Sequence, residues 1–183
     1  MRISSFNINK FCGAYWSLQK GGYYNPRNLD FKTKIKGIVD SLLTGMDDIV
    51  VLQEFIDNQF INVSHLFEQS RYEIFANSDY KECKSNVVAN TLKDSGWKKV
   101  DLQAEVKCPN KLIKMKHSDK NILLLGLHNT GVDIKKQISK EFQLKEADII
   151  LGDFNDQDWL SVLSNSDEYR GLVPDEVITY KPG

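Results

Sequence analysis

Four short strand-like segments, each ending in polar side chains, are the feature of this sequence that most constrains its fold. They are SFNIN (5–9), DIVVLQE (48–54), NILLLGLHN (121–129) and DIILGDFND (148–156). Short apolar runs of this kind, rich in β-branched residues, are typical of buried β-strands. Ligand clefts form where the strands of a sheet end. The sequence therefore predicts a β-sheet core with a polar cleft at the ends of its strands.

The remaining segments predict a mixed α/β (α+β) chain. The clearest helix covers 30–48, because Ile35, Ile38, Val39, Leu42, Leu43 and Met46 fall on one face of a 3.6-residue repeat, and Gly45 is placed to end it. We expect further helices at 57–69 and 133–147, and further strands at 2–8, 72–76, 85–92, 98–106 and 176–180. This order predicts one domain over residues 1–183, with two sheets inside and helices outside.

Composition excludes several classes of protein. The formal net charge of −1 gives no overall attraction to nucleic acid or anionic membranes, so a polyanionic partner would have to meet a local patch. The apolar runs are far shorter than the ~20 residues of a membrane-spanning helix, and the first residues lack the pattern of a signal peptide. Three widely spaced cysteines give no disulfide framework. We therefore expect a cytoplasmic protein without a membrane span.

Two segments are candidates for contact with a polyanion. Residues 107–120 contain five lysines between two expected strands, which predicts a hairpin loop that either is simply solvated or contacts phosphates. Residues 11–24 are rich in aromatic residues and could stack on bases. We interpret His65 as a helix-face residue and His117 as a loop residue.

The polar residues at the four strand ends indicate a shared site. A carboxylate after an apolar run is costly to bury without a partner, and Mg²⁺ is a suitable one because it binds carboxylate and amide oxygens while keeping several waters. Each residue also has a purely structural interpretation: Glu54 could pair with a lysine, and His128 could be a hydrogen-bonded core histidine. Asn7 and Asn9 could be turn residues, and GDFN could be a capped turn. Their common position at strand ends favours the shared site.

At this point the motifs resemble a known family. SFNIN, DIVVLQE, LLGLHNTG and IILGDFND are similar, in order and spacing, to motifs of the endonuclease/exonuclease/phosphatase superfamily, and TYKPG at 179–183 is similar to a later segment. The resemblance implies a four-layer sandwich of two mixed β-sheets flanked by helices, with a cleft at one edge. It also implies a phosphodiester hydrolase that depends on Mg²⁺ (or Mn²⁺), and His128 favours a nuclease.

The resemblance implies roles at the metal and the phosphate. Glu54 would be the main metal ligand, with help from Asn7. Asn7 and Asn9 would also contact the substrate phosphate. Asn155 would hold a non-bridging phosphate oxygen.

The resemblance also implies how protons are moved. Asp153 would orient or deprotonate the attacking water, and His128 would contact the phosphate or protonate the leaving oxygen. The family normally has a later Ser-Asp-His segment, but no histidine follows His128 here. We expect that the native polypeptide continues with the missing strands; alternatively, the protein is a non-catalytic member or another chain supplies the pair.

These features leave several functions open. We expect a nuclease acting on nucleic acid. The alternatives are a non-catalytic binding protein with the same fold, and a phosphatase- or phospholipase-type enzyme acting on phosphorylated small molecules or lipid head groups. The sequence does not specify DNA over RNA, endo- over exo-cleavage, or the oligomeric state.

Overall fold

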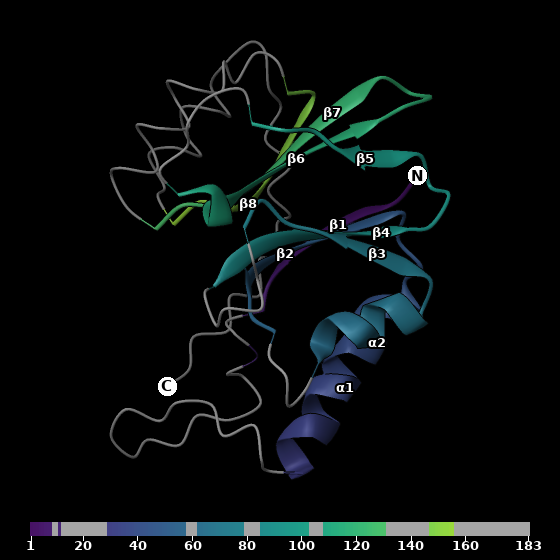
Figure 1. Ribbon diagram of the computed structural model, residues 1–183, viewed down its shortest axis with the longest axis vertical. Helices are drawn as coiled ribbons and strands as arrows, with labels where there is room; N and C mark the ends of the chain where they lie inside the picture. Colours follow the sequence, from purple (N-terminus) through teal and green to yellow (C-terminus); the bar gives the residue numbers. More distant parts are fainter. Residues whose placement is uncertain are drawn as a thin grey trace, which may run out of the picture.

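Two four-stranded sheets packed face to face form the centre of the protein (Figure 1). The computed structural model describes residues 1–8, 11, 29–57, 62–78, 85–102, 108–130 and 147–155 of the 183-residue chain. The first sheet has the order β1-β2-β4-β3, with β1 (Ile3–Asn7), β2 (Ile49–Phe55), β3 (Tyr72–Phe75) and β4 (Asn86–Leu92). The second has the order β5-β6-β7-β8, with β5 (Trp97–Lys99), β6 (Leu112–His117), β7 (Ile122–His128) and β8 (Ile149–Asp153).

Each sheet contains one parallel pair of strands. β1 runs parallel to β2 and β7 runs parallel to β8, whereas the other neighbours are antiparallel. The prediction of two mixed sheets is therefore confirmed. The helix predicted at 133–147 and the strand predicted at 176–180 lie outside the described residues.

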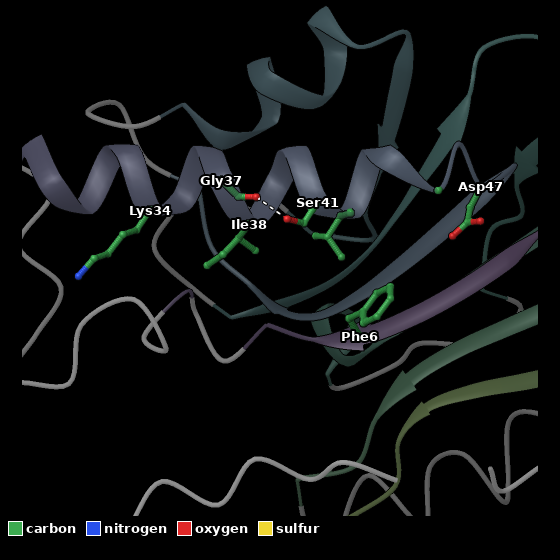
Figure 2. A pocket seen from close by; sticks show the side chains of 8 residues that line it. Phe6, Lys34, Gly37, Ile38, Ser41 and Asp47 are labelled. Carbon is green, nitrogen blue, oxygen red and sulfur yellow. Dashed lines mark hydrogen bonds between the residues drawn. The ribbon is translucent and has the colours of Figure 1, made fainter. Parts of the chain in front are cut away.

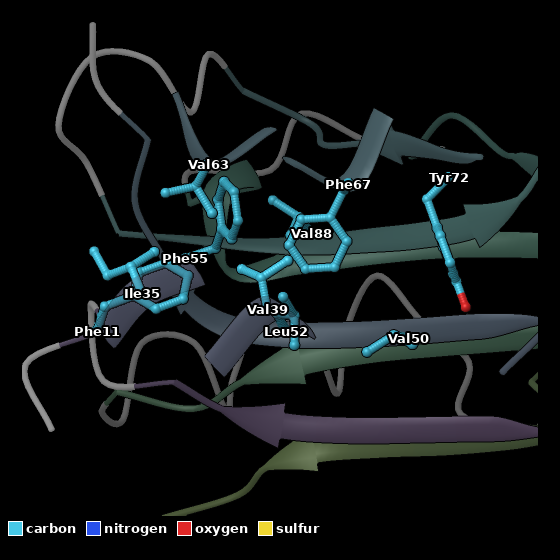
Figure 3. Close-up of a cluster of buried hydrophobic side chains, with 10 residues drawn as sticks. All are labelled: Phe11, Ile35, Val39, Val50, Leu52, Phe55, Val63, Phe67, Tyr72 and Val88. Carbon is cyan, nitrogen blue, oxygen red and sulfur yellow. The ribbon is translucent and has the colours of Figure 1, made fainter. Parts of the chain in front are cut away.

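Two helices, α1 (Leu29–Thr44) and α2 (Val63–Gln69), cover the outer face of the first sheet (Figure 1). Figure 3 shows the hydrophobic core between these helices and the first sheet. The rings of Phe55 and Phe67 pack edge to face with their centroids 6.5 Å apart, and those of Phe67 and Tyr72 do so at 6.3 Å. The predicted helical face is correct for Ile35 and Val39, which are fully buried. Among the described residues, neither helix has the length and apolar character needed to cross a membrane.

Met46 and Phe11 do not lie where the sequence predicts them. Met46 follows the end of α1 with a φ of 48° and is 68% exposed, so the apolar face ends before it. Phe11, in the segment expected to stack on bases, is buried and packs against Phe55 with ring centroids 6.1 Å apart. The rest of 12–24 lies outside the described residues.

The basic segment 107–120 is not the predicted hairpin loop. It contains a 3₁₀ turn (Pro109–Lys111) and then β6, an inner strand of the second sheet. Ile113 and Met115 are fully buried, so their apolar contacts decide the structure despite the neighbouring lysines. His117 is also buried, with its ring 5.2 Å from that of Trp97, and is not a loop residue.

The strand predicted at 98–106 is also shorter than expected. β5 ends at Lys99, although the Val100 N–H still donates to the Lys114 carbonyl at 2.9 Å. Residues 103–107 lie outside the described part of the chain. His65 lies on an exposed face of α2, as predicted.

The two sheets pack closely against each other at Gly126 of β7. A Cβ atom at this position would lie 2.7 Å from Val51 Cγ1 of β2 and 2.8 Å from Ile113 Cγ2 of β6. Both neighbours are fully buried branched side chains, so they have little room to move. Glycine therefore sets the spacing between the sheets two residues before His128.

We predict that Gly126→Ala destabilises the protein by about 1–3 kcal/mol, because the added methyl group overpacks the interface between the sheets. The matched control is Gly37→Ala in α1, where the added Cβ would meet no atom within 4 Å. That substitution should stabilise the protein by about 0.5–1 kcal/mol through helix propensity. Urea unfolding curves measure both changes, and equal effects at the two glycines would contradict the packing argument.

A second prediction concerns Asp48, which precedes β2. Its Oδ2 accepts the Arg2 backbone N–H at 2.5 Å and lies 3.6 Å from the amino group of Met1. The hydrogen bond from Arg2, supported by the nearby positive charges, holds the pKa of Asp48 below its usual range, although partial burial opposes this. A lowered folded-state pKa adds stability above the unfolded value of about 3.9, and this stability is lost as the pH falls through the folded-state pKa.

Asp48→Asn should therefore reduce the free energy of unfolding at pH 7, by less than about 1 kcal/mol because the carboxylate is partly exposed. The difference between the two proteins should persist at pH 5 and shrink below about pH 4. Urea titrations at several pH values measure it. A difference that does not change with pH would show that the charge of Asp48 is not responsible.

Candidate active site

Four of the predicted site residues meet at the C-terminal ends of the two parallel strand pairs. Asn7 ends β1 and Glu54 lies near the end of β2, while His128 ends β7 and Asp153 ends β8. In the registers, Asn7 lies opposite Gln53, and His128 lies opposite Asp153. Because parallel neighbours end at the same edge of a sheet, each sheet brings two polar side chains to this edge.

Short contacts join the four side chains across the two sheets. Asn7 Nδ2 donates to Asp153 Oδ2 at 2.6 Å and to Glu54 Oε1 at 3.3 Å. His128 Nε2 lies 3.6 Å from Glu54 Oε1 and 3.9 Å from Asp153 Oδ2. The His128 side chain is 5% exposed, whereas those of Glu54 and Asp153 are 19% and 24% exposed. The carboxylates thus lie at the opening of the site, with the imidazole deeper inside.

A bulge in β2 turns Glu54 toward this site. The β2–β4 register shifts between Leu52 and Phe55, and Glu54 has a φ of 55°, in the left-handed region. An extra residue in one strand redirects the side chains around it. Gln53, the preceding residue, is buried and donates from Nε2 to Ser5 Oγ at 2.9 Å, so it supports the strand pair.

The segment after β8 is held by Asn155 and Asn129. The Asn155 backbone N–H donates to Asp153 Oδ1 at 3.1 Å, and its side-chain Nδ2 donates to the Asn129 carbonyl at 2.9 Å. In return, Asn129 donates from its backbone N–H to the Asp153 carbonyl and from Nδ2 to the Phe154 carbonyl, both at 2.8 Å. Asn155 therefore orients Asp153, and its predicted contact with phosphate stays a prediction.

Gly152 permits the close pairing that brings Asp153 into the site. Its φ is 145°, and a Cβ atom would lie 1.9 Å from the Leu127 carbonyl oxygen of β7. No side chain could be accommodated there, which explains the glycine in the GDFN motif. Asn9, the sixth predicted site residue, lies outside the described residues.

Sequence reasoning missed Lys111 and Ser85. Lys111 Nζ lies 3.5 Å from His128 Nδ1 and 3.3 Å from Ser85 Oγ. The sequence analysis treated the lysines of 107–120 as one loop and did not separate them. The Pro109-Asn110 turn before the apolar residues of β6 was the signal that a strand starts directly after Lys111. Since Leu112 pairs with Leu127 in antiparallel β7, this start lies next to His128.

The chemistry of the site suits a hard divalent cation. Among the described residues, no group of three or more His, Cys, Asp or Glu side chains is arranged as a metal site. Mg²⁺ does not need such a group, because one or two carboxylates with amide oxygens and waters suffice. The carboxylates of Glu54 and Asp153 both contact one atom of Asn7, so two anionic groups and an amide converge on one point. These side chains would fit such an ion: Glu54 would hold it, and Asn7 would help if its amide turned to present Oδ1 in place of Nδ2.

An open groove between α1 and β1 contains none of these residues. Figure 2 shows Phe6 facing the side chains of α1, and Ile38 and Leu42 also line the groove. Phe6 precedes Asn7 in β1, so the two side chains point to opposite faces of the sheet. The groove is therefore separate from the candidate site.

Comparison with known proteins supports the fold. No protein-family model and no curated protein sequence matches the chain. Among solved structures, it is similar to the endonuclease/exonuclease/phosphatase from Bacteroides vulgatus (16% identity, TM-score 0.54), covering 90% of this chain and 70% of that one. It is also similar to an AP endonuclease from Archaeoglobus fulgidus (14% identity, TM-score 0.52, covering 93% and 67%). A third similar structure is humanized D. rerio TDP2 (17% identity, TM-score 0.51, covering 87% and 68%).

These likenesses, with the two mixed sheets, show that the chain has the endonuclease/exonuclease/phosphatase fold, as its motifs predict. The chain spans between 67% and 70% of the length of these three structures. At such low sequence identities the comparison establishes the fold, and the activity has to be argued from the site.

We predict that Mg²⁺ or Mn²⁺ stabilises the protein through Glu54. A cation bound with a dissociation constant of about 0.5 mM would add about 1.4 kcal/mol at about 5 mM, which corresponds to a rise of about 3–6 °C in Tm. Glu54→Gln should abolish the rise, measured by calorimetry with and without the cation. Glu73→Gln, which removes an exposed carboxylate on β3, is the matched control and should keep it. An equal rise in both variants would contradict a metal site at Glu54.

Proposed function

We propose that the protein is a divalent-metal-dependent phosphodiester hydrolase whose substrate is nucleic acid. The observation that carries the proposal is the meeting of Asn7, Glu54, His128 and Asp153 across two sheets, through contacts of 2.6 to 3.9 Å. The similar structures, one an AP endonuclease and one a TDP2, support the choice of a nuclease.

The metal ion and its ligands would provide the positive charge that the reaction needs. A phosphodiester is anionic, and Mg²⁺ (or Mn²⁺) bound here would neutralise it and stabilise the charge of the pentacovalent transition state. Glu54 would hold the ion with help from Asn7, and Asn7 and Asn9 would contact the phosphate. Asn155 would hold a non-bridging oxygen or, through its backbone N–H, keep Asp153 in place.

Asp153 and His128 would share the work of moving protons. Oδ1 of Asp153 accepts the Asn155 N–H, and Oδ2 is the oxygen that faces the other site residues. Asp153 is thus oriented to hold or deprotonate the attacking water. His128 Nε2 lies beside both carboxylates, where it can donate to a phosphate or leaving-group oxygen. Positioned acids and bases of this kind typically contribute about 10²–10⁴-fold each.

A non-catalytic binding protein is the second candidate. The described part of the site brings the imidazole of His128 to the two carboxylates, and these groups could hold a cation and a phosphate without cleaving a bond. A protein of this kind would bind the cation and the nucleic acid and leave the phosphodiester intact.

We predict Mg²⁺-dependent cleavage of plasmid DNA or single-stranded RNA, measured by gel electrophoresis and by the release of labelled ends. Glu54→Gln and Asp153→Asn should each reduce the rate by at least about 100-fold, because each removes a group used in the transition state. Glu73→Gln should cleave at the wild-type rate.

The competing functions give different results in the same experiment. Metal-dependent binding of the nucleic acid without cleavage would overturn the enzymatic proposal and favour the binding protein. Hydrolysis of inositol phosphates or sphingomyelin with no cleavage of nucleic acid would identify the other phosphoesterase class. Cleavage unchanged by both substitutions would place the activity elsewhere or in a contaminant.

A further inference from the structure

Lys111 and the two carboxylates contact opposite nitrogen atoms of the His128 ring. The Lys111 ammonium lies 3.5 Å from Nδ1, while Glu54 and Asp153 lie 3.6 and 3.9 Å from Nε2. The ring itself is buried, with 5% of its side chain exposed. Its two edges therefore face a cation on one side and anions on the other.

Lys111 is held in this place by its own turn. The 3₁₀ turn Pro109–Lys111 is closed by the Lys111 N–H, which donates to the Cys108 carbonyl at 3.0 Å. Two contacts join this turn to the residue before β4: Asn110 Nδ2 donates to the Ser85 carbonyl at 2.8 Å, and Lys111 Nζ donates to Ser85 Oγ at 3.3 Å. The turn thus fixes the backbone of Lys111, and Ser85 Oγ holds its ammonium in addition to the contact with His128.

The chemistry of these neighbours selects one tautomer of the ring. A lysine ammonium has three donors and no acceptor, so the histidine nitrogen that faces it must present a lone pair. An ionised carboxylate has acceptors alone, so the nitrogen that faces Glu54 and Asp153 must carry a hydrogen. Both requirements give the same answer: a lone pair on Nδ1 and a hydrogen on Nε2. The hydrogen bond made by one ring nitrogen thereby sets the state of the other.

We propose that Lys111 is a positioning residue that holds His128 in the Nε2–H tautomer, with this hydrogen directed at the carboxylates of Glu54 and Asp153. The consequence for catalysis rests on the proposed function: His128 would act through Nε2 as a hydrogen-bond donor to the phosphate or leaving oxygen. In this state Nε2 cannot accept a proton from water, so Asp153 remains to orient or deprotonate the attacking water. The two side chains therefore have separate roles.

The tautomer can be measured without any assay of activity. We expect the ¹⁵N–¹H correlation spectrum of the imidazole groups, recorded at about pH 8.5 where an ordinary histidine is neutral, to show His128 as the Nε2–H form. Lys111→Met should raise the share of the Nδ1–H form, and Lys111→Arg, which keeps a cationic donor, should restore the wild-type spectrum. Lys116→Met, which removes an exposed lysine from β6, the strand that follows Lys111, is the matched control and should leave the spectrum unchanged.

Kinetics with bis(4-nitrophenyl) phosphate and Mg²⁺ test the catalytic consequence. Removing a partner that orients a functional side chain typically costs about 10–100-fold. Lys111→Met should lower kcat by about 10-fold while KM changes less than about 3-fold, and Lys111→Arg should recover most of kcat. A residue that merely supported the fold would lower the amount of folded protein and would not be rescued in this selective way.

Ser85→Ala keeps the test decisive if Lys111→Met does not fold. It removes one anchor of the ammonium and leaves the lysine present, so it should shift the tautomer and kcat in the same direction by a smaller factor. An Nδ1–H form in the folded wild-type protein would overturn the inference without any variant. The inference would also be overturned if Lys111→Met folded and kept both the tautomer and the kcat of the wild-type protein.

Failure of the proposed function would look different. A wild-type protein that shows the Nε2–H form, and loses it in Lys111→Met, but hydrolyses no phosphodiester would support the positioning role and reject the enzyme. Hydrolysis that is equal in the wild-type protein and in Lys111→Met, with the Nδ1–H form already present in the wild-type protein, would support the enzyme and reject the positioning role.

Discussion

The amide of Asn7 joins the two halves of the site, and the rest of the arrangement depends on this contact. Glu54 belongs to the first sheet and Asp153 to the second, and their negative charges repel each other. Asn7 Nδ2 donates to both, at 3.3 and 2.6 Å, which offsets this repulsion and ties β1 to β8. A donor or cation shared by two neighbouring carboxylates offsets their mutual repulsion. The site is therefore organised around a point where positive charge is needed.

The same strand arrangement in both sheets explains why this point exists. Each sheet has a parallel pair at one edge, β1 with β2 and β7 with β8, followed by two antiparallel neighbours. Face-to-face packing brings the ends of these pairs together, and Gly126 lets the sheets approach closely just before His128. The two parallel pairs thus bring four polar side chains together, two from each sheet.

Much of this could be predicted from the sequence, because the relevant signals are local. Apolar runs identified β2, β7 and β8, and the polar residues at their ends identified Glu54, His128 and Asp153 as neighbours. Other features depend on tertiary contacts that no local pattern records. β6 was obscured by its lysines, since the burial of Ile113 and Met115 outweighs the local charge, and the bulge at Glu54 appears only in the register with β4. Lys111 was missed because its contact with His128 depends on the pairing of β6, the strand that follows it, with β7.

The distribution of charge explains why a cation suits this site. Lys111 contacts the His128 ring at Nδ1, whereas the two partly exposed carboxylates lie near Nε2 on the opposite edge of the ring. An approaching phosphate would meet these negative charges first, and the net charge of −1 supplies no general attraction. A divalent ion held between carboxylates and phosphate would reverse the local field. The positions of the lysine, the imidazole and the carboxylates are thus mutually consistent: the protein supplies oriented donors and acceptors, and the charge that attracts a phosphate would come from a bound ion.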